Sequence, residues 1–395
     1  MASESWAPIS TETVAWDSRF PGEESRRSRL TSRGPYEAAL PPFIHHAELP
    51  QLDAHLLATA EDAVLEVSRF DAEMGGVVAP FSALLLRSES ASSSEIERLT
   101  ASARAIAMAE LGRSAGSNAQ LVVANSRAME SAVRLSNDLD EDAVVEMQRV
   151  LLGDSARDLT GRWRHEPVWV GGRGNSPHGA EFVPPRHERV PELMSDLLAF
   201  AQRDNLPILP QVAIAHAQFE TIHPFPDGNG RTGRALVHSM FRRLGVTRST
   251  TVPVSAGLLS DTNRYFAALT AYRSGDLAPI VEVFVEASLG AVDNGRRLVA
   301  ELSAVRADWD ARSTARKGSG AARAMDVLLR QQVVDANFLA EELQITPQNA
   351  QNAIDRLVDD GILSATASQR RNRSYEAAEV SEALENFAAR ARRRS

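Results

Sequence analysis

The chain has 395 residues, a net charge of −9 at neutral pH and no cysteine. The length predicts two or three domains at ~150 residues each, and 43% hydrophobic with 24% charged residues excludes a wholly disordered chain. The missing cysteine excludes disulfides, thiolate metal sites and a cysteine nucleophile. No apolar run approaches the ~18 residues of a membrane span and no secretory signal is recognisable, so we expect a cytoplasmic protein with no membrane contact.

The first part of the chain divides into an arm and a helical region. Residues 1–40 are rich in Ser, Glu, Arg and Pro and are expected to form an extended or partly ordered arm, which ends at Pro41-Pro42. Apolar positions at helical spacing between Leu49 and Arg69 predict an amphipathic helix, and residues 95–150 are mostly helical in pattern. We therefore assign residues 41–150 to an N-terminal helical region.

The middle of the chain, residues 151–300, is expected to form a separate domain. Between Trp163 and Pro185, two short extended runs flank a Gly/Asn turn, which predicts a β-hairpin. Helical patterning returns at Pro191, and strand signals are otherwise sparse. The predicted fold class is therefore mainly α with one small hairpin.

The C-terminal part, residues 321–395, is predicted to be a winged-helix module with a basic tail. It comes after a helix end and linker at 301–320. Counted from Ala311 onward, the chain carries a small excess of basic residues, in contrast to the acidic remainder. Thr346 is a good N-cap and Pro347 a good first-turn residue for a recognition helix over 348–360. Four residues of that helix are expected to face inward: Ala350, Ile354, Leu357 and Val358.

The run from His223 to Arg234, HPFPDGNGRTGR, is the most informative stretch. Apolar residues at helical spacing precede and follow it, so the run is predicted to be a tight loop between two buried helices. Gly228, Asn229 and Gly230 would let successive backbone N–H groups converge on an anion. The N-terminus of the second helix would add the positive end of its dipole.

Four side chains of the same run suit phosphate chemistry. Arg231 and Arg234 are three residues apart and share a helix face, so their guanidinium groups can grip phosphate oxygens. Asp227 offers a hard oxygen ligand for Mg²⁺, and His223 can be neutral near pH 7, as a general base must be. A lone histidine near a helix end, or a lone Gly-Asn-Gly turn, is usually structural. The combination at this spacing favours attack of a hydroxyl on a nucleotide phosphate.

These residues resemble the Fic family, whose signature HxFx(D/E)GNGRxxR is matched at every fixed position from His223 to Arg234. Similarity extends outward to the runs VWVGG (168–172), FVPP (182–185) and AHAQFETIHPF (215–225). The resemblance implies a mostly helical domain with a β-hairpin flap. It also implies Mg²⁺-dependent transfer of AMP from ATP to a Ser, Thr or Tyr hydroxyl of a target protein, or of the chain itself.

The resemblance also assigns roles. His223 would deprotonate the target hydroxyl, Asp227 would hold Mg²⁺, and Phe225 would anchor the loop in the core. The implied nucleotide and phosphate contacts are Gly228, Asn229, Gly230, Arg231, Thr232, Gly233 and Arg234. Tyr265 is placed to stack on adenine, with a core position as the alternative. The hairpin around 171–182 would be the flap that aligns the target segment.

A segment near residue 95 resembles the family's inhibitory helix, [ST]xxxE[GN]. Ser93 and Glu97 match, whereas Arg98 stands where Gly or Asn is expected. The resemblance implies that Glu97 pairs with Arg234 and competes with the ATP γ-phosphate. The alternative is a helix N-terminal capping box, which Ser92…Glu95 and Ser94…Glu97 both fit.

Other functions stay open at this point. Exposed amides at Gln348, Asn349, Gln351 and Asn352, with Arg356, suit DNA bases, but winged helices also bind proteins or form dimers. The runner-up function is thus a DNA-binding regulator whose Fic domain mainly binds nucleotide. A third alternative is a Fic enzyme that removes AMP or transfers another phosphate-containing group.

Overall fold

The computed structural model describes residues 6–16, 34–50, 52–76, 80–113, 115–153, 156–172, 176–366 and 373–392. It is built mainly from helices and divides into two compact units. Unit 1 comprises residues 1–63, 131–244 and 263–285, and unit 2 comprises 64–130, 245–262 and 286–395. The chain therefore passes between the units several times, so neither unit is one continuous stretch.

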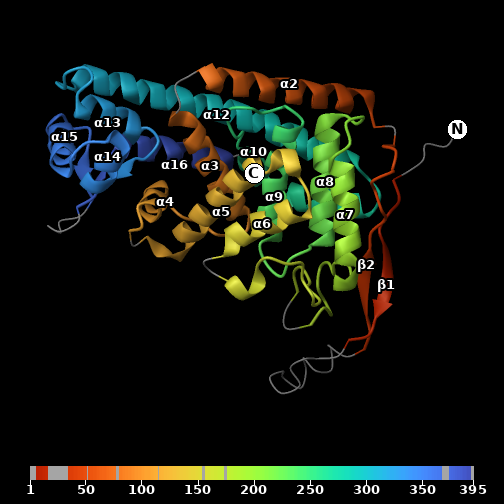
Figure 1. Ribbon diagram of the computed structural model, residues 1–395. Helices are drawn as coiled ribbons and strands as arrows, with labels where there is room; N and C mark the ends of the chain where they lie inside the picture. Colours follow the sequence, from red (N-terminus) through yellow and green to blue (C-terminus); the bar gives the residue numbers. More distant parts are fainter. Residues whose placement is uncertain are drawn as a thin grey trace. The chain divides into compact units, whose positions relative to one another are not determined.

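Unit 1 opens with two strands that the sequence analysis did not predict. Strands β1 (Ser10–Val14) and β2 (Tyr36–Leu40) are antiparallel, with Ser10 opposite Leu40 and Val14 opposite Tyr36, and they run side by side in Figure 1. Part of the expected extended arm is thus an ordered β-ladder. The pairing joins segments separated by 21 residues, so no hairpin turn signal announces it.

The core of unit 1 is a group of helices around α8. Helix α8 packs between α7 and α9 (Figure 1), and its residues from Leu209 to Ile222 are all buried. A helix buried all round must lie at the centre of its domain. The helical elements of unit 1 are η1 (Ser136–Asp138), α6 (Glu141–Leu152), η2 (Arg157–Leu159), η3 (His187–Arg189), α7 (Val190–Ala201), α8 (Ile208–Ile222), α9 (Asn229–Arg243) and α11 (Thr262–Arg273).

Unit 2 is organised around α3, which packs on α10 and α16. The carboxylate of Glu89 on α3 accepts from the backbone N–H of Ser255 at 2.8 Å and also from its hydroxyl, which satisfies the start of α10. Helices shared with unit 1 are α2 (Ala54–Gly76), α5 (Gly116–Arg134) and α12 (Ala278–Arg312). The others are α3 (Pro80–Ile96), α4 (Ala103–Glu110), α10 (Val254–Leu259), α13 (Gly320–Leu328), α14 (Ala336–Leu343), α15 (Pro347–Asp359) and α16 (Ala378–Arg392).

The C-terminal module of unit 2 combines α13, α14 and α15 with three short strands, β3 (Val333–Val334), β4 (Ser364–Ala365) and β5 (Tyr375–Glu376), in the antiparallel order β3-β5-β4. The predicted start of α15 is confirmed: the Thr346 side chain accepts from the Asn349 N–H, and Pro347 is the first helical residue. Val358, expected to face inward, is 38% exposed, because α15 buries a narrower stripe than its apolar residues suggest. The predicted basic wing tip at 369–373 and the end of the basic tail lie largely outside the described residues.

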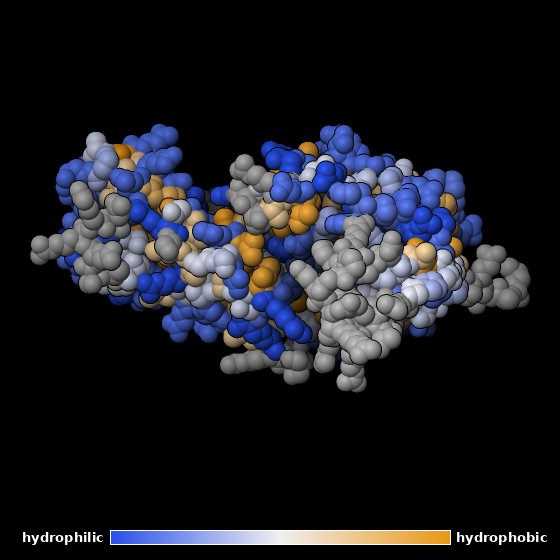
Figure 2. Space-filling view, turned by 90° about the horizontal axis from the view of Figure 1, so that it is seen from below, coloured by the Kyte–Doolittle hydropathy of each residue, from blue (hydrophilic) through white to orange (hydrophobic). Residues whose placement is uncertain are grey.

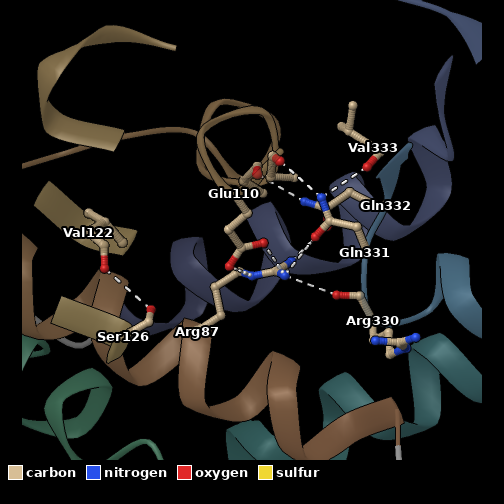
Figure 3. A network of polar contacts seen from close by, with 10 residues as sticks. Arg87, Glu110, Val122, Ser126, Arg330, Gln331, Gln332 and Val333 are labelled. Carbon is tan, nitrogen blue, oxygen red and sulfur yellow. Dashed lines mark hydrogen bonds and ion pairs between the residues drawn. The ribbon is translucent and has the colours of Figure 1, made fainter. Parts of the chain in front are cut away.

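A buried arginine on α3 joins three segments of unit 2 (Figure 3). The Arg87 guanidinium pairs with both carboxylate oxygens of Glu110, with Nε to Oε1 at 3.0 Å and Nη2 to Oε2 at 2.5 Å. It also donates to the side-chain oxygens of Gln331 and Gln332 and to the carbonyl oxygen of Arg330. Helix α3, the end of α4 and the segment before β3 are therefore held by one side chain.

The surface carries hydrophobic residues in small groups. Figure 2 shows them separated by hydrophilic residues on the face it draws. The large hydrophobic side chains exposed among the described residues are Phe43, Leu65, Leu159, Phe266 and Val358. Within the described residues, no helix has the length and apolar character needed to cross a bilayer.

Candidate active site

A tight loop joins α8 to α9 as predicted, but it is shorter than the predicted run of 223–234, because residues 229–234 already belong to α9. Helix α8 ends at Ile222 and α9 begins at Asn229. Close packing of α9 on α8 leaves no room for a side chain at Gly233. A Cβ there would lie 2.8 Å from Glu220 Oε1 and 2.9 Å from a Phe219 ring carbon. Only glycine lets α9 approach α8 this closely. The run from His223 to Gly228 is thereby fixed between two buried helices.

His223 caps α8 in a left-handed backbone conformation, with φ 51° and ψ 62°. Its N–H donates to the Phe219 carbonyl oxygen at 2.9 Å. A non-glycine residue with positive φ is uncommon, and a residue before proline is normally pushed towards extended conformations. Because Pro224 is the next residue, the conformation of His223 is strained, and strain of this kind clusters at functional sites.

The side chain of Asn229 closes the loop from the other end. Its Oδ1 accepts from the Phe225 N–H and its Nδ2 donates to the Phe225 carbonyl oxygen, both at 2.8 Å. Phe225 is fully buried, which confirms it as the core anchor. The amide of Asn229 is thus occupied by the loop, and its backbone N–H remains as the group that it can offer to an anion.

The N-terminus of α9 brings together the groups that are expected to bind an anion. Gly228 is the N-cap with φ 78°, and a Cβ there would come within 2.9 Å of a Leu151 methyl carbon. Arg231 and Arg234 are both buried, and Arg231 Nη2 lies 3.8 Å from Asp227 Oδ1. The start of this 15-residue helix therefore carries two guanidinium groups as well as the first backbone N–H groups of the helix. Both kinds of group favour an anion at that end.

Burial and neighbouring charge keep the His223 imidazole neutral. Desolvation lowers the pKa of His223 to about 4, and the positive charges of Arg164 and Arg273 act in the same direction, whereas Asp227 opposes them. Within the described part of the chain, His223 Nδ1 has no hydrogen-bond partner. A neutral imidazole at pH 7 is the protonation state that a general base needs.

Asp227 fits a magnesium ion held together with substrate phosphates. Its side chain is 59% exposed, and Oδ1 accepts from the Gly228 N–H at 2.7 Å. Among the described residues, no three His, Cys, Asp or Glu side chains converge on a point that could hold a metal. Mg²⁺ usually takes one or two carboxylates and completes its shell with water and phosphate oxygens, so one carboxylate suffices for that type of site.

The predicted hairpin is reduced to one antiparallel bridge between Val170 and Phe182, with Val170 N–H to Phe182 O at 2.9 Å. Its predicted turn at 173–175 lies outside the described residues. Strand β2 continues the pairing, because the Ala39 N–H donates to Val183 O at 3.0 Å. The Arg273 guanidinium carbon lies 3.6 Å from the centre of the Phe182 ring, a cation–π contact at the base of the hairpin.

Tyr265 has the core position that was the alternative to adenine stacking. Its side chain is 1% exposed, and its hydroxyl lies 2.8 Å from His216 Nε2. His216 Nδ1 lies 3.2 Å from the Gly233 carbonyl oxygen, so Nδ1 carries the hydrogen and Nε2 accepts from the phenol. A phenol used in this way cannot stack on a nucleotide, and we correct that prediction.

Three residues at the site were missed by the sequence analysis: Arg164, Arg273 and His216. None belongs to the signature, and each acts through partners far away in the chain. Arg164 is 59 residues from His223, with which its side chain bonds. The sequence contains only indirect signals. Arg164 is a charged residue in the segment 163–185, for which a hairpin is predicted, and His216 lies in the run 215–225 that resembles the family.

The predicted inhibitory segment forms the end of α3 in unit 2. Ser93 is buried, and α3 ends at Ile96, immediately before Glu97. The Arg98 N–H donates to Glu95 O and the Leu99 N–H to Ser94 O, while Arg98 has φ 64°. This is a Schellman C-terminal motif. The capping-box alternative is therefore wrong, because the serines lie in the last turns of a helix.

Comparisons with known proteins agree with this site. Residues 138–241 match the model of the Fic/DOC family. The chain is 34% identical over 153 residues to "Protein adenylyltransferase fic-1" of Caenorhabditis elegans, covering 37% of this chain and 27% of that protein. It is 26% identical over 164 residues to "Protein adenylyltransferase Fic" of Nematostella vectensis, covering 41% and 35%. The matched part thus spans about a third or less of these relatives.

A solved structure extends the likeness in fold. A Fic family protein from Desulfovibrio desulfuricans G20 superimposes with a TM-score of 0.51 at 22% identity, covering 84% of this chain and 98% of that one. The signature loop, the family match and this mainly helical fold all agree. The chain therefore contains a region, residues 138–241, that matches the Fic/DOC family.

Proposed function

We propose that the chain is a protein adenylyltransferase that uses ATP to attach AMP to a protein hydroxyl group. The relatives carry that activity in their names, and the site has the groups that the reaction needs. The observation that carries the proposal is geometric: one short loop joins His223, the C-cap of α8, to the N-terminus of α9, so the base and the anion cradle belong to one loop.

The reaction is an in-line substitution at the α-phosphorus. The target oxygen forms the new bond to phosphorus, its proton passes to the His223 imidazole, and pyrophosphate leaves with the electrons of the broken bond. Arg231, Arg234 and the N–H groups at the start of α9 would hold the phosphates. Mg²⁺, when bound at Asp227, supplies neutralisation of phosphate charge. Hydrolytic removal of AMP from a modified protein would be a different step, in which water attacks the phosphorus, the target oxygen leaves and takes up a proton, and AMP is released.

Transfer of label from α-labelled ATP tests the proposal. We expect purified protein, incubated with a cell lysate, to label one or a few proteins or itself. His223→Ala should reduce labelling about 10²- to 10⁴-fold, the range of general-base catalysis, while leaving ATP binding intact. Labelling that survives His223→Ala would contradict the assigned base, and its complete absence in every variant would contradict the activity.

We further propose that Glu97 restrains this activity. The support is the match of Ser93 and Glu97 to the inhibitory pattern and the position of Glu97 at the end of α3; the pairing with Arg234 rests on the resemblance alone. Glu97→Gly should raise labelling. Glu95→Gln is the matched control, because Glu95 binds Arg392 at 2.6 Å and lies on the same turn. Equal activation by both variants would indicate general loosening of α3 instead.

For the C-terminal module, we infer a winged helix, supported by the order of its helices and the β3-β5-β4 sheet. DNA binding is favoured by the exposed Gln348, Asn349 and Asn352 on α15, because side-chain amides can read base edges. It is disfavoured by Arg356, which already contacts Thr314 and Asp360. The full chain should therefore shift DNA in a salt-dependent manner, and Gln348→Ala with Asn352→Ala should relax its sequence preference. If DNA is not shifted, a protein partner or self-association is the other outcome.

The cytoplasmic location of the protein stays a prediction.

A further inference from the structure

Arg164 is a buried arginine of unit 1 whose side chain donates to backbone groups. It is almost fully buried, with 2% exposure of the residue. The guanidinium donates to four carbonyl oxygens, from Nε to His223 at 2.8 Å, from Nη1 to Glu166 at 3.2 Å, and from Nη2 to Pro185 at 2.5 Å and Ile222 at 3.3 Å. Its own backbone N–H donates to Pro224 O at 2.9 Å.

We propose that Arg164 is a positioning residue that holds the His223 imidazole and the base of the flap in one fixed arrangement. The inference rests on the proposed adenylyl transfer, for which His223 is the base. It goes beyond that function, because it assigns a role to a residue outside the signature. Arg164 acts through His223 and does not itself contact the reacting atoms.

The first argument is the strain at His223. Left-handed backbone before a proline is unfavourable for a side-chain-bearing residue and persists only where the surroundings impose it. Arg164 binds the carbonyl oxygens of Ile222, His223 and Pro224, three consecutive residues across the turn. The charge-assisted bonds from its guanidinium orient the peptide planes at His223, and the direction of the imidazole depends on them.

The second argument is the bond to Pro185. Pro185 lies three residues after Phe182, which pairs with Val170 and lies under Arg273. The same Nη2 atom of Arg164 reaches both Pro185 O and Ile222 O. The segment proposed to align the target and the residue proposed to accept its proton are thus bonded to one planar group. An error in their spacing of ~1 Å can cost about 10²-fold in rate.

The third argument is the choice of arginine. A guanidinium presents five donors in a rigid plane, whereas an ammonium is a compact point charge on a flexible stem. Four acceptors from three parts of the chain require the planar fork. Burial lowers the pKa of Arg164 to about 10, still far above neutral pH, so the group remains a cation. Its charge also favours the neutral form of His223.

The test compares Arg164→Met, Arg164→Lys and the control Arg162→Met in the full-length chain carrying Glu97→Gly. Arg162 is an exposed arginine two residues away whose side chain donates to Asp158 O. AMP incorporation is measured against ATP concentration, which gives a maximal rate and a half-saturating concentration. Arg164→Met should lower the maximal rate about 10- to 100-fold and change half-saturation less than about twofold, because the phosphate cradle on α9 is intact.

Arg164→Lys should recover part of the rate, and Arg162→Met should change neither quantity. A merely structural role of Arg164 would lower the amount of folded protein and leave the rate per folded molecule unchanged; thermal unfolding gives that amount. A rate loss shared by Arg162→Met, or an unchanged rate in Arg164→Met, would overturn the proposal. If Arg164→Met does not fold, Arg164→Lys and Arg164→Gln carry the comparison.

A second readout does not depend on activity. In protein with ¹³C-labelled histidine, the His223 ring signal is identified by its loss in His223→Ala. Removing Arg164 should shift this signal and raise the pKa of His223, because Arg273 is then the remaining cation that lowers this pKa, while the Asp227 carboxylate and a hydrogen bond with the Glu220 backbone raise it. An unchanged His223 signal in Arg164→Met overturns the proposal even where no AMP transfer is found, whereas absent transfer with a shifted signal counts against the proposed function alone.

Discussion

Arg87 in unit 2 and Arg164 in unit 1 are buried arginines that each join several segments, and their hydrogen-bonding groups are satisfied in opposite ways. Arg87 in unit 2 pairs with a carboxylate, Glu110, in addition to its amide partners. Arg164 in unit 1 binds backbone carbonyl oxygens. The pKa of Glu110 is raised by desolvation, against the pull of Arg87, whereas the pKa of Arg164 falls to about 10 because burial disfavours its charge.

The difference indicates that Arg87 holds segments together, whereas the charge of Arg164 also acts on a neighbouring titratable group. A buried ion pair has little net field beyond its immediate surroundings, so Arg87 can join α3, α4 and the segment before β3 without perturbing distant groups. A cation held only by dipoles keeps its field, and in unit 1 that field acts on His223. We therefore expect loss of Arg87 to affect mainly stability, and loss of Arg164 to affect mainly the imidazole.

The largest expected effect is on stability when the ion pair is broken from one side. Arg87→Met leaves the Glu110 carboxylate, whose side chain is 25% exposed, without its cation. The free energy of unfolding should fall by at most about 3–5 kcal/mol, the range for a fully buried pair. The double variant Arg87→Met with Glu110→Met removes both charges and should be destabilised by clearly less. Urea unfolding of the unsubstituted protein, the single variant and the double variant at about pH 7.5 measures the differences in the free energy of unfolding. Equal losses in the single and double variants would mean that the pair is not a unit.

Lowering the pH should have opposite effects on stability through one group in each unit, His216 in unit 1 and Glu110 in unit 2. Burial and the charge of Arg234 lower the pKa of His216 to about 3, below the ~6.5 of an unfolded chain. The unfolded state therefore binds a proton between these values and the folded state does not, so this contribution to stability is lost as pH falls below about 6.5. The loss amounts to about 3 kcal/mol at about pH 4.5. Glu110 has a raised pKa and acts oppositely, since protonation relieves its burial cost.

Hydrogen exchange measures this contrast within one sample. Between about pH 7.5 and pH 4.5, after correction for intrinsic exchange rates, amides of α8 and α9 should lose more protection than those of α4. In His216→Gln, the pH dependence of the free energy of unfolding should shrink by the same ~3 kcal/mol. Uniform loss across both units would show that His216 does not account for the acid sensitivity.

How much the sequence could predict depends on the range of the interactions. The loop from His223 to Gly228, the buried Phe225 and the Thr346-Pro347 start of α15 depend on neighbours within a few residues, and these predictions are confirmed. The β1–β2 ladder and the contacts of Arg164 join segments that no local pattern connects. Tyr265 was ambiguous for the same reason, because its partner His216 lies 49 residues away.

The smallest expected effect concerns the end of α3. Arg98 adopts φ 64° at the position of a Schellman motif that glycine usually occupies. The Cβ of an L-residue is strained there, so Arg98→Gly should raise the free energy of unfolding by about 1 kcal/mol. Arg98→Ala removes the same charge but keeps the Cβ and should give no comparable gain. Thermal unfolding of both variants at one ionic strength separates backbone strain from charge.

The same pair of variants bears on the proposed restraint by Glu97. Glycine at position 98 relieves strain in the turn that orients Glu97, so a carboxylate acting from that turn should be held more firmly. We therefore expect Arg98→Gly to lower AMP transfer modestly, by about two- to fivefold for ~0.5–1 kcal/mol, and to have no effect once Glu97→Gly is present. A stabilised Arg98→Gly protein with raised activity would show that the strained turn, and not its relaxed form, maintains the restraint.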